Sequence, residues 1–90
     1  MPSKDEMLSK AISSNSRRDI LRLLCKNPQT VTNISKSMNI SLSLASKHLT
    51  LLDYSGVIEA EIKFPEKYYS IKLKGIKNLL KIYDKLINEL

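Results

Sequence analysis

The stretch from Thr32 to Gly56 constrains this chain more than any other, because it has the features of two helices joined by a tight turn. Thr32 can cap the first helix, on which Ile34 and Met38 lie four residues apart and therefore on one side. Asn39 follows, and asparagine tolerates the left-handed backbone that a sharp reversal needs. Gly56 is a suitable residue just beyond the end of the second helix.

The second helix, which Ser41 can cap at its N-terminus, has two different sides. Ala45, Leu49 and Leu52 fall at helical spacing, so this side must face the protein. The opposite side collects small, hydroxylic and cationic residues with no acid among them, and such a surface can approach base edges in the major groove. It consists of Ser43, Ser46, Lys47 and Thr50, and we interpret residues 32–55 as a helix-turn-helix.

Length and charge limit the class of protein. Ninety residues make one domain, spanning residues 1–90, and a chain this short buries only about 60–65% of its unfolded surface, so a partner subunit would help it. A net charge of +6 favours a polyanionic partner. No acid lies between Asp19 and Asp53, and the basic residues inside that window are Arg22, Lys26, Lys36 and Lys47.

Two helices are expected before the helix-turn-helix. Asp5 and Glu6 suit the first turn of a helix that ends near Ser14, and Ser16 with Asp19 resembles a capping box that opens the next helix. The only cysteine, Cys25, lies between Leu24 and Lys26. A small buried core residue is one interpretation of it. A redox-sensitive thiol is the other, and would need exposure and a lowered pKa that Lys26 could only partly provide.

After Gly56 the apolar period changes to two, in residues 57–64 and again in residues 68–73, around a turn at 65–67 with proline in its second position. A hairpin placed directly after such a helix is a wing, here residues 57–73. Its tip offers Lys63 and Lys67. Because neighbouring acids would repel phosphate unless they face away, we expect contact with the DNA backbone rather than with bases; these acids are Glu59, Glu61 and Glu66.

Residues 74–90 form a long amphipathic helix that would span roughly 25 Å. Its apolar stripe either packs on its own domain or forms a dimer seam. We favour the seam, because a compact winged domain cannot cover the whole stripe and each exposed apolar side chain forgoes about 1.5–3 kcal/mol of burial. The stripe is Ile76, Leu79, Leu80, Tyr83, Leu86, Ile87 and Leu90, and the first helix would contribute Met7, Leu8 and Ala11.

Four segments carry a family resemblance: Arg-Asp-Ile-Leu at 18–21, Val-Thr-Asn-Ile at 31–34, Ser-x-Ser-x-Ala-Ser-x-His-Leu-x-x-Leu at 41–52, and Tyr-Ser-Ile-Lys-Leu at 69–73. With the order of elements, they resemble the ArsR-type winged-helix transcriptional regulators. The resemblance implies a mainly α fold with a small β-hairpin (α+β), ordered helix, helix, helix, helix, strand, strand, helix. It also implies dimerisation through the first and last helices, and operator contact by Ser41, Ser43, Leu44, Ser46 and Lys47.

The chain departs from the metal-sensing members of that family. Such members carry a Cys-x-Cys motif on the first helix of the helix-turn-helix, or paired ligands on the last helix. Here residues 32–38 have no thiol and the last helix has no histidine, whereas a zinc site needs about four ligands. We therefore expect no metal and no cofactor. We also expect no catalysis, because the two glycines form no phosphate loop and one histidine supports no triad.

Several residues allow two interpretations. His48, on the flank of the inward side, is either partly buried or in contact with a base. Lys47 is either solvated or bound to phosphate or guanine. Leu44 either touches a thymine methyl group or packs under the turn. Arg17, Arg18 and Lys36 are candidates for phosphate contacts.

The residues thus favour a sequence-specific regulator, a repressor, that binds double-stranded DNA as a homodimer at an inverted-repeat operator. Because no signal peptide or long apolar run precedes the domain, we expect a cytoplasmic protein that does not bind membranes. Two alternatives are a nonspecific architectural DNA-binding protein and a winged-helix module for protein interaction. The acid-free window speaks against the second, and the hydroxyl-rich side of the helix favours base readout over the first.

Overall fold

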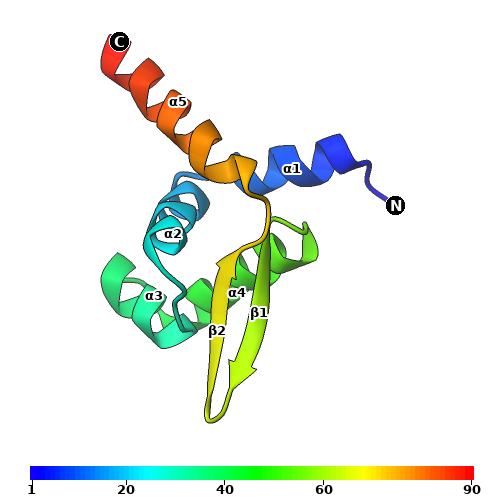
Figure 1. Ribbon diagram of the computed structural model, residues 1–90, viewed down its shortest axis with the longest axis vertical. Helices are drawn as coiled ribbons and strands as arrows, with labels where there is room; N and C mark the ends of the chain where they lie inside the picture. The colour runs from blue at the N-terminus through cyan, green and yellow to red at the C-terminus, as the bar shows by residue number, and fades with distance from the viewer.

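The computed structural model describes residues 1–90 and has the order of elements that the sequence predicts (Figure 1). Five helices accompany one two-stranded antiparallel sheet, which confirms the mainly α fold with a small hairpin. No helix is both long and apolar enough to cross a lipid bilayer. The elements are α1 (Lys4–Ile12), α2 (Asn15–Lys26), α3 (Val31–Met38), α4 (Leu42–Tyr54), β1 (Ile58–Lys63), β2 (Glu66–Ile71) and α5 (Gly75–Glu89).

The turn between α3 and α4 has the expected backbone. Asn39 adopts the left-handed conformation, with φ 54° and ψ 46°, and its N–H points to the carbonyl groups of the last turn of α3. The Ser35 hydroxyl donates to the Ile40 carbonyl at 2.7 Å, which closes the turn. Ser41 then caps α4 by accepting from the Leu44 N–H at 3.0 Å. After α4, Gly56 has a φ of +78°.

Two helices begin earlier than the sequence predicts. The N-cap of α2 is Ser14 rather than Ser16, and the N-cap of α3 is Thr30 rather than Thr32. For α3 the reason is a bridge in which the backbone groups of Gln29 and Tyr69 exchange hydrogen bonds of 3.0 and 2.8 Å. This bridge keeps the chain extended up to Thr30, so the helix starts at the first residue that is free to cap it.

The hairpin also differs from its predicted boundaries. Lys63 pairs with Glu66, so the turn consists of Phe64 and Pro65 alone, and the peptide bond between them is cis. When the turn is counted as four residues from Lys63 to Glu66, the proline is therefore the third residue and not the second, and β2 begins at Glu66 rather than at residue 68. The register pairs Ile58 with Ile71 at the base of the hairpin.

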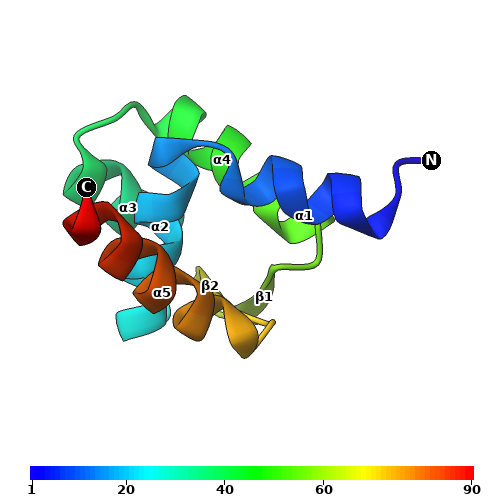
Figure 2. The same cartoon turned by 90° about the horizontal axis from the view of Figure 1, so that it is seen from above.

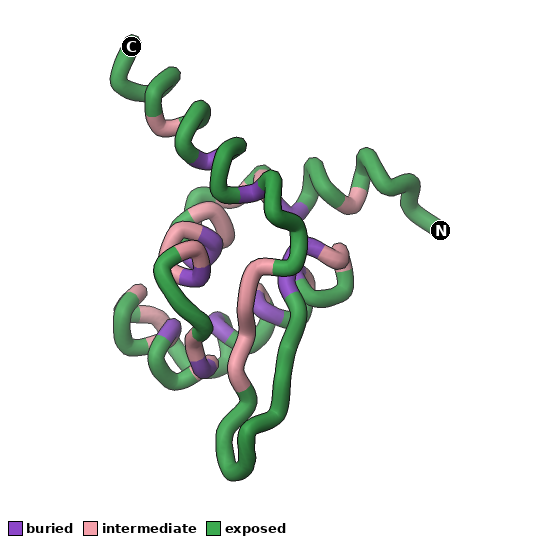
Figure 3. The backbone as a smooth tube through the Cα atoms, in the orientation of Figure 1, coloured by how far each residue is buried: buried purple, intermediate pink, exposed green.

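The core lies where α2, α3 and α4 meet the base of the hairpin (Figure 3). The three residues that the sequence assigns to the inner side of α4, Ala45, Leu49 and Leu52, are fully buried. The hairpin projects away from this core, and most of α5 is exposed. The largest fully buried side chains are those of Ile20, Leu21, Ile34, Leu49, Leu52, Val57 and Ile58.

Three residues predicted for a dimer seam instead belong to this core. Ala11 is fully buried, and Ile76 and Leu80 are only 3% and 5% exposed. The reason is that α1 and the first half of α5 pack on α2. The side chains on the inner side of these two helices are therefore already covered within one subunit. The prediction that these three residues pair with a second subunit is therefore wrong.

The backbone at Gly56 yields a test of the fold. The substitution Gly56→Ala should lower the free energy of unfolding by about 1–2 kcal/mol, because a residue with a Cβ disfavours positive φ. A Cβ there would meet no atom within 4 Å, so the backbone alone sets the cost. Gly75→Ala is the matched control, since that glycine is equally open and has no positive φ. Urea unfolding that gave the same stability for both variants would contradict this assignment.

Candidate nucleic-acid interface

The outward side of α4 is a polar surface with no acid from Ser43 to Thr50, and the one exposed acid of the helix, Asp53, lies at its C-terminal end. Ser43, Ser46, Lys47 and Thr50 are exposed, whereas the side chains on the opposite side of α4 lie in the core. In Figure 1, α3, α4 and the hairpin occupy the end of the molecule opposite the C-terminus of α5. Leu44 is also exposed, at 41%, and so is Leu42, at 53%, which the sequence analysis did not single out.

The positive charges of this surface are not neutralised within the chain. Only two ion pairs occur, and both belong to Arg22 of α2, which binds Asp19 on the same helix and Asp84 on α5. Lys47 on α4 and Lys36 on α3 are exposed and form no ion pair. Unpaired lysine ammonium groups on an exposed surface are free to bind phosphate.

His48 is partly buried, which agrees with the first of its two interpretations. Burial, with a smaller contribution from the nearby positive charge of Arg17, lowers the pKa of His48 below its ordinary value of 6.5. The imidazole is therefore neutral near pH 7 and adds no charge to the surface of α4.

Arg17 and Arg18 have a structural role that the sequence did not predict. The Arg17 guanidinium donates to the carbonyl groups of Ala11 at 3.2 Å and Lys10 at 2.6 Å. The Arg18 guanidinium donates to the Ile12 carbonyl at 2.7 Å and lies 4.8 Å from the ring centre of Tyr83. The last carbonyl groups of a helix have no partner within it, so the two arginines bind the end of α1 and hold it on α2.

The hairpin separates its charges between two faces. In the pairing of β1 with β2, Glu59, Glu61 and Lys63 lie opposite Ser70, Tyr68 and Glu66 on one face. Lys67 lies on the other face opposite Ile62, and its ammonium group is 5.2 Å from the ring centre of Tyr69. The three acids thus face away from Lys67. Phosphate contact by the wing requires this arrangement, because acids on the same face would repel phosphate. Lys63 shares its face with the acids.

Two further residues of this surface, Tyr54 of α4 and Lys10 of α1, were not predicted from the sequence. Tyr54, which is 67% exposed, follows Ser43, Lys47 and Thr50 at helical spacing, so the periodicity alone could have found it. Lys10 comes from α1, and no local pattern predicts that this helix lies beside α4. A groove brings these residues together, and its lining is Lys10, Ser46, Lys47, Thr50, Leu51 and Tyr54.

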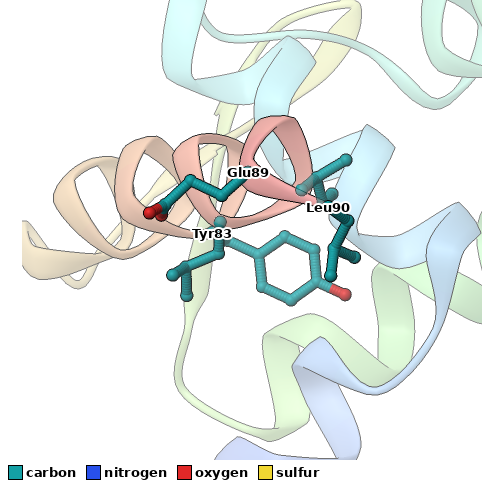
Figure 4. A pocket seen from close by; sticks show the side chains of 5 residues that line it. Tyr83, Glu89 and Leu90 are labelled. Carbon is teal, nitrogen blue, oxygen red and sulfur yellow. The ribbon is translucent and has the colours of Figure 1, made fainter.

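The outer half of α5 carries an exposed apolar stripe. Ile76 and Leu80 anchor the inner half in the core, and Arg22 of α2 binds the Asp84 carboxylate through contacts of 2.6 and 3.3 Å. These contacts leave another side of the helix uncovered, where Tyr83, Leu86, Ile87, Glu89 and Leu90 line a shallow groove (Figure 4). Ile82, 58% exposed, extends the apolar surface and was missed in the sequence, whereas Leu79 at 38% and Leu8 at 38% had been predicted.

The remaining polar candidates do not form a second site. Cys25 is half-buried against the core, and burial raises the pKa of its thiol although Lys77 acts in the opposite direction. A thiol with a raised pKa has little reactive thiolate at neutral pH, which favours the interpretation as a core residue. Nowhere do three or more His, Cys, Asp or Glu side chains gather as potential metal ligands.

Together, a helix-turn-helix followed by a β-hairpin defines a winged helix-turn-helix, a fold of DNA-binding proteins. The sequence profile of the arsR family of bacterial regulatory proteins matches residues 14–60. That match covers more than half of the chain, and the chain belongs to this family of DNA-binding transcriptional regulators, which are not enzymes. A comparison with curated protein sequences found no match.

Solved structures agree with this assignment. The homodimeric winged helix-turn-helix DNA-binding domain of Mb0332 from Mycobacterium bovis, a possible ArsR-family regulator, is 26% identical with a TM-score of 0.85. The match covers 96% of this chain and 80% of that one. HlyU from Vibrio cholerae is 25% identical with a TM-score of 0.82, over 92% and 90% of the two chains. BigR from Xylella fastidiosa is 19% identical with a TM-score of 0.82, over 89% and 82%, and supports the fold alone.

The role of Arg17 can be tested by substitution. Arg17→Ala should lower the free energy of unfolding by about 1.5–3 kcal/mol, because it removes charged hydrogen bonds to the end of α1. The salt dependence of DNA binding should stay unchanged, since the guanidinium is already engaged by carbonyl groups of α1. Urea unfolding and a salt titration of DNA binding measure the two effects. Normal stability together with a weaker salt dependence would restore the phosphate role.

Proposed function

We propose that this chain is a sequence-specific transcriptional regulator that binds double-stranded DNA as a homodimer and represses by occupying an inverted-repeat operator. The observation that carries the proposal is the outward side of α4, where hydroxyl groups and an unpaired lysine are exposed with no acid among them. A helix with such a side can enter the major groove and donate to base edges and phosphates. We expect it to act in the cytoplasm, without a metal.

The proposed DNA contacts follow from the exposed surface. The α4 side supplies base and phosphate contacts, α3 supplies one lysine, and the wing supplies backbone contacts. Arg17 and Arg18 are left out because their guanidinium groups bind the end of α1. The proposed set is Lys36, Ser41, Ser43, Leu44, Ser46, Lys47 and Thr50, with Lys67 of the wing. Lys63 is left out because it shares its face with Glu59, Glu61 and Glu66.

The homodimer is supported by the uncovered apolar stripe. Leu86 is 56% exposed and Ile87 is 49% exposed, although both lie on an ordered helix whose inner half is fixed to the core. Covering the exposed half of each such side chain would gain about 1 kcal/mol. The similar Mycobacterium bovis domain is homodimeric. The proposed interface consists of Met7, Leu8, Leu79, Ile82, Tyr83, Leu86, Ile87 and Leu90.

Selection of bound duplexes from a random pool tests the function. We expect enrichment of an inverted repeat whose half-sites are about 10 base pairs apart, or a multiple of this. The selected site should be preferred over random DNA by at least about 10³. Binding without enrichment would favour the architectural alternative, and no binding at low salt would favour a protein-interaction module. Either result would refute the proposal.

The reading surface is tested by Lys47→Ala on the selected site. Losing one phosphate contact per subunit should flatten the log–log salt slope by about 0.9 for each. Loss of a guanine contact should instead cost about 1–3 kcal/mol and relax the base preference at one position. Lys85→Ala on α5 removes the same charge from an exposed position away from α4 and is the control. Unchanged affinity of the Lys47→Ala protein at fixed salt would show that this surface is wrongly assigned.

The dimer surface is tested by Leu86→Asp. An aspartate in the centre of an apolar seam would be buried without a partner, so the variant should sediment as a folded monomer. Because Leu86 is more than half exposed in one subunit, the fold of that subunit should persist. Lys85→Asp, at the neighbouring exposed position, should remain dimeric. A dimeric Leu86→Asp protein would place the interface elsewhere.

A further inference from the structure

The groove between α1 and α4 has the composition of a phosphate site. Its lining contains two lysines, Lys10 and Lys47, together with the hydroxyl groups of Ser46, Thr50 and Tyr54, and it contains no acid. In Figure 2 α1 and α4 lie side by side, and a second groove along the same junction is again lined by Lys10 and Tyr54. Two elements distant in sequence thus form one cationic, hydroxyl-rich surface.

The charge of Lys10 is available to a ligand. Neither ion pair of the chain involves it. The acid that lines the adjoining groove is Glu6, whose carboxylate accepts from the Ser3 hydroxyl at 3.1 Å and from the Ser3 N–H at 3.4 Å, at the start of α1. Lys10 is also held in place, because Arg17 binds its backbone carbonyl at 2.6 Å. The Lys10 side chain is exposed, and its backbone is fixed to α2 by Arg17.

The position of the groove along α4 indicates which part of the DNA it meets. A recognition helix contacts base edges mainly through its N-terminal residues. Tyr54 is the last residue of α4, so this end of the helix lies nearer the rim of the major groove, where the phosphates are. Lysine ammonium and tyrosine hydroxyl groups are among the usual partners of DNA phosphates.

We propose that Lys10 of α1 and the Tyr54 hydroxyl of α4 bind backbone phosphates at the rim of the major groove that α4 enters. This site rests on the proposed function and extends it: the first helix, beyond its part in a dimer, contributes directly to DNA affinity. The contact is made to the backbone, so it strengthens binding to all sequences equally and adds nothing to base preference.

The experiment measures the affinity of the intact protein for its selected duplex and for random duplex over a range of salt concentrations. Lys10→Ala should weaken binding to both duplexes by the same factor and flatten the log–log salt slope by about 0.9 per subunit. Lys4→Ala is the matched control, because it removes the same charge from the same helix at a position that lines a different groove. Its slope should equal that of the wild type.

Tyr54→Phe provides an independent measurement, because it removes only the hydroxyl group. It should weaken binding by about twofold to tenfold per contact, the effect of losing one hydrogen bond, without changing the salt slope. Equal slopes for Lys10→Ala and Lys4→Ala would overturn this proposal, and so would unchanged affinity of Tyr54→Phe. Such a negative result for Lys10→Ala or Tyr54→Phe refutes the α1 site alone when the wild-type protein still prefers its selected site and Lys47→Ala still impairs binding. A wild-type protein that binds no DNA refutes the proposed function itself.

Discussion

The attachment of α4 to the core determines what this domain can present to a partner. Ala45, Leu49 and Leu52 are fully buried, so the helix cannot rotate without exposing apolar surface. The opposite side of the helix then points outward, and its exposed residues Ser46, Lys47 and Thr50 carry hydroxyl and ammonium groups. Asn39 in the left-handed conformation and Ser41 as N-cap fix where α4 begins. The orientation of the polar side therefore follows from hydrophobic packing rather than from any interaction within that side.

The inner half of the last helix, α5, is attached to the core, whereas one side of its outer half is exposed. Its inner half is anchored by Ile76 and Leu80 in the core, and Asp84 extends this attachment through its contacts with Arg22. That ion pair is partly exposed, and such pairs contribute little stability, so its main effect is to orient the helix. The apolar side chains beyond it are left uncovered at the end of the molecule opposite the hairpin (Figure 1). One subunit can therefore pair at one end while it presents α4 and the wing at the other.

Periodicity predicted those features that depend on local spacing. The inner side of α4, the turn at Asn39, the cap at Ser41 and the order of elements all follow from patterns within a few residues. The hairpin was predicted for the same reason, although its turn is tighter because Lys63 pairs directly with Glu66. Local pattern also contained the signal for Tyr54, which shares the period of Lys47 but was not recognised.

The features that the sequence could not predict depend on contacts between distant elements. Arg17 resembles a free cation beside the helix-turn-helix, and only the position of α1 shows that its guanidinium binds the carbonyl groups of Lys10 and Ala11. In the sequence, Ala11 resembles part of an exposed apolar stripe, but in the structure α1 packs on α2 and Ala11 is fully buried. Thr30 caps α3 because a bridge to Tyr69 holds the chain before it. In each case the residue contacts another helix or strand, and the local sequence pattern does not predict where that element lies.

Hydrophobic packing of Ala45, Leu49 and Leu52 turns the polar side of α4 outward, where we propose that it meets DNA. Backbone amide chemical shifts, recorded while the selected duplex is added to isotopically labelled dimer, test it most directly. The account predicts that the largest changes fall on residues 41–54, with smaller changes at the hairpin tip, and that the outer half of α5 stays unchanged. Changes concentrated on α5, with α4 unaffected, would contradict it.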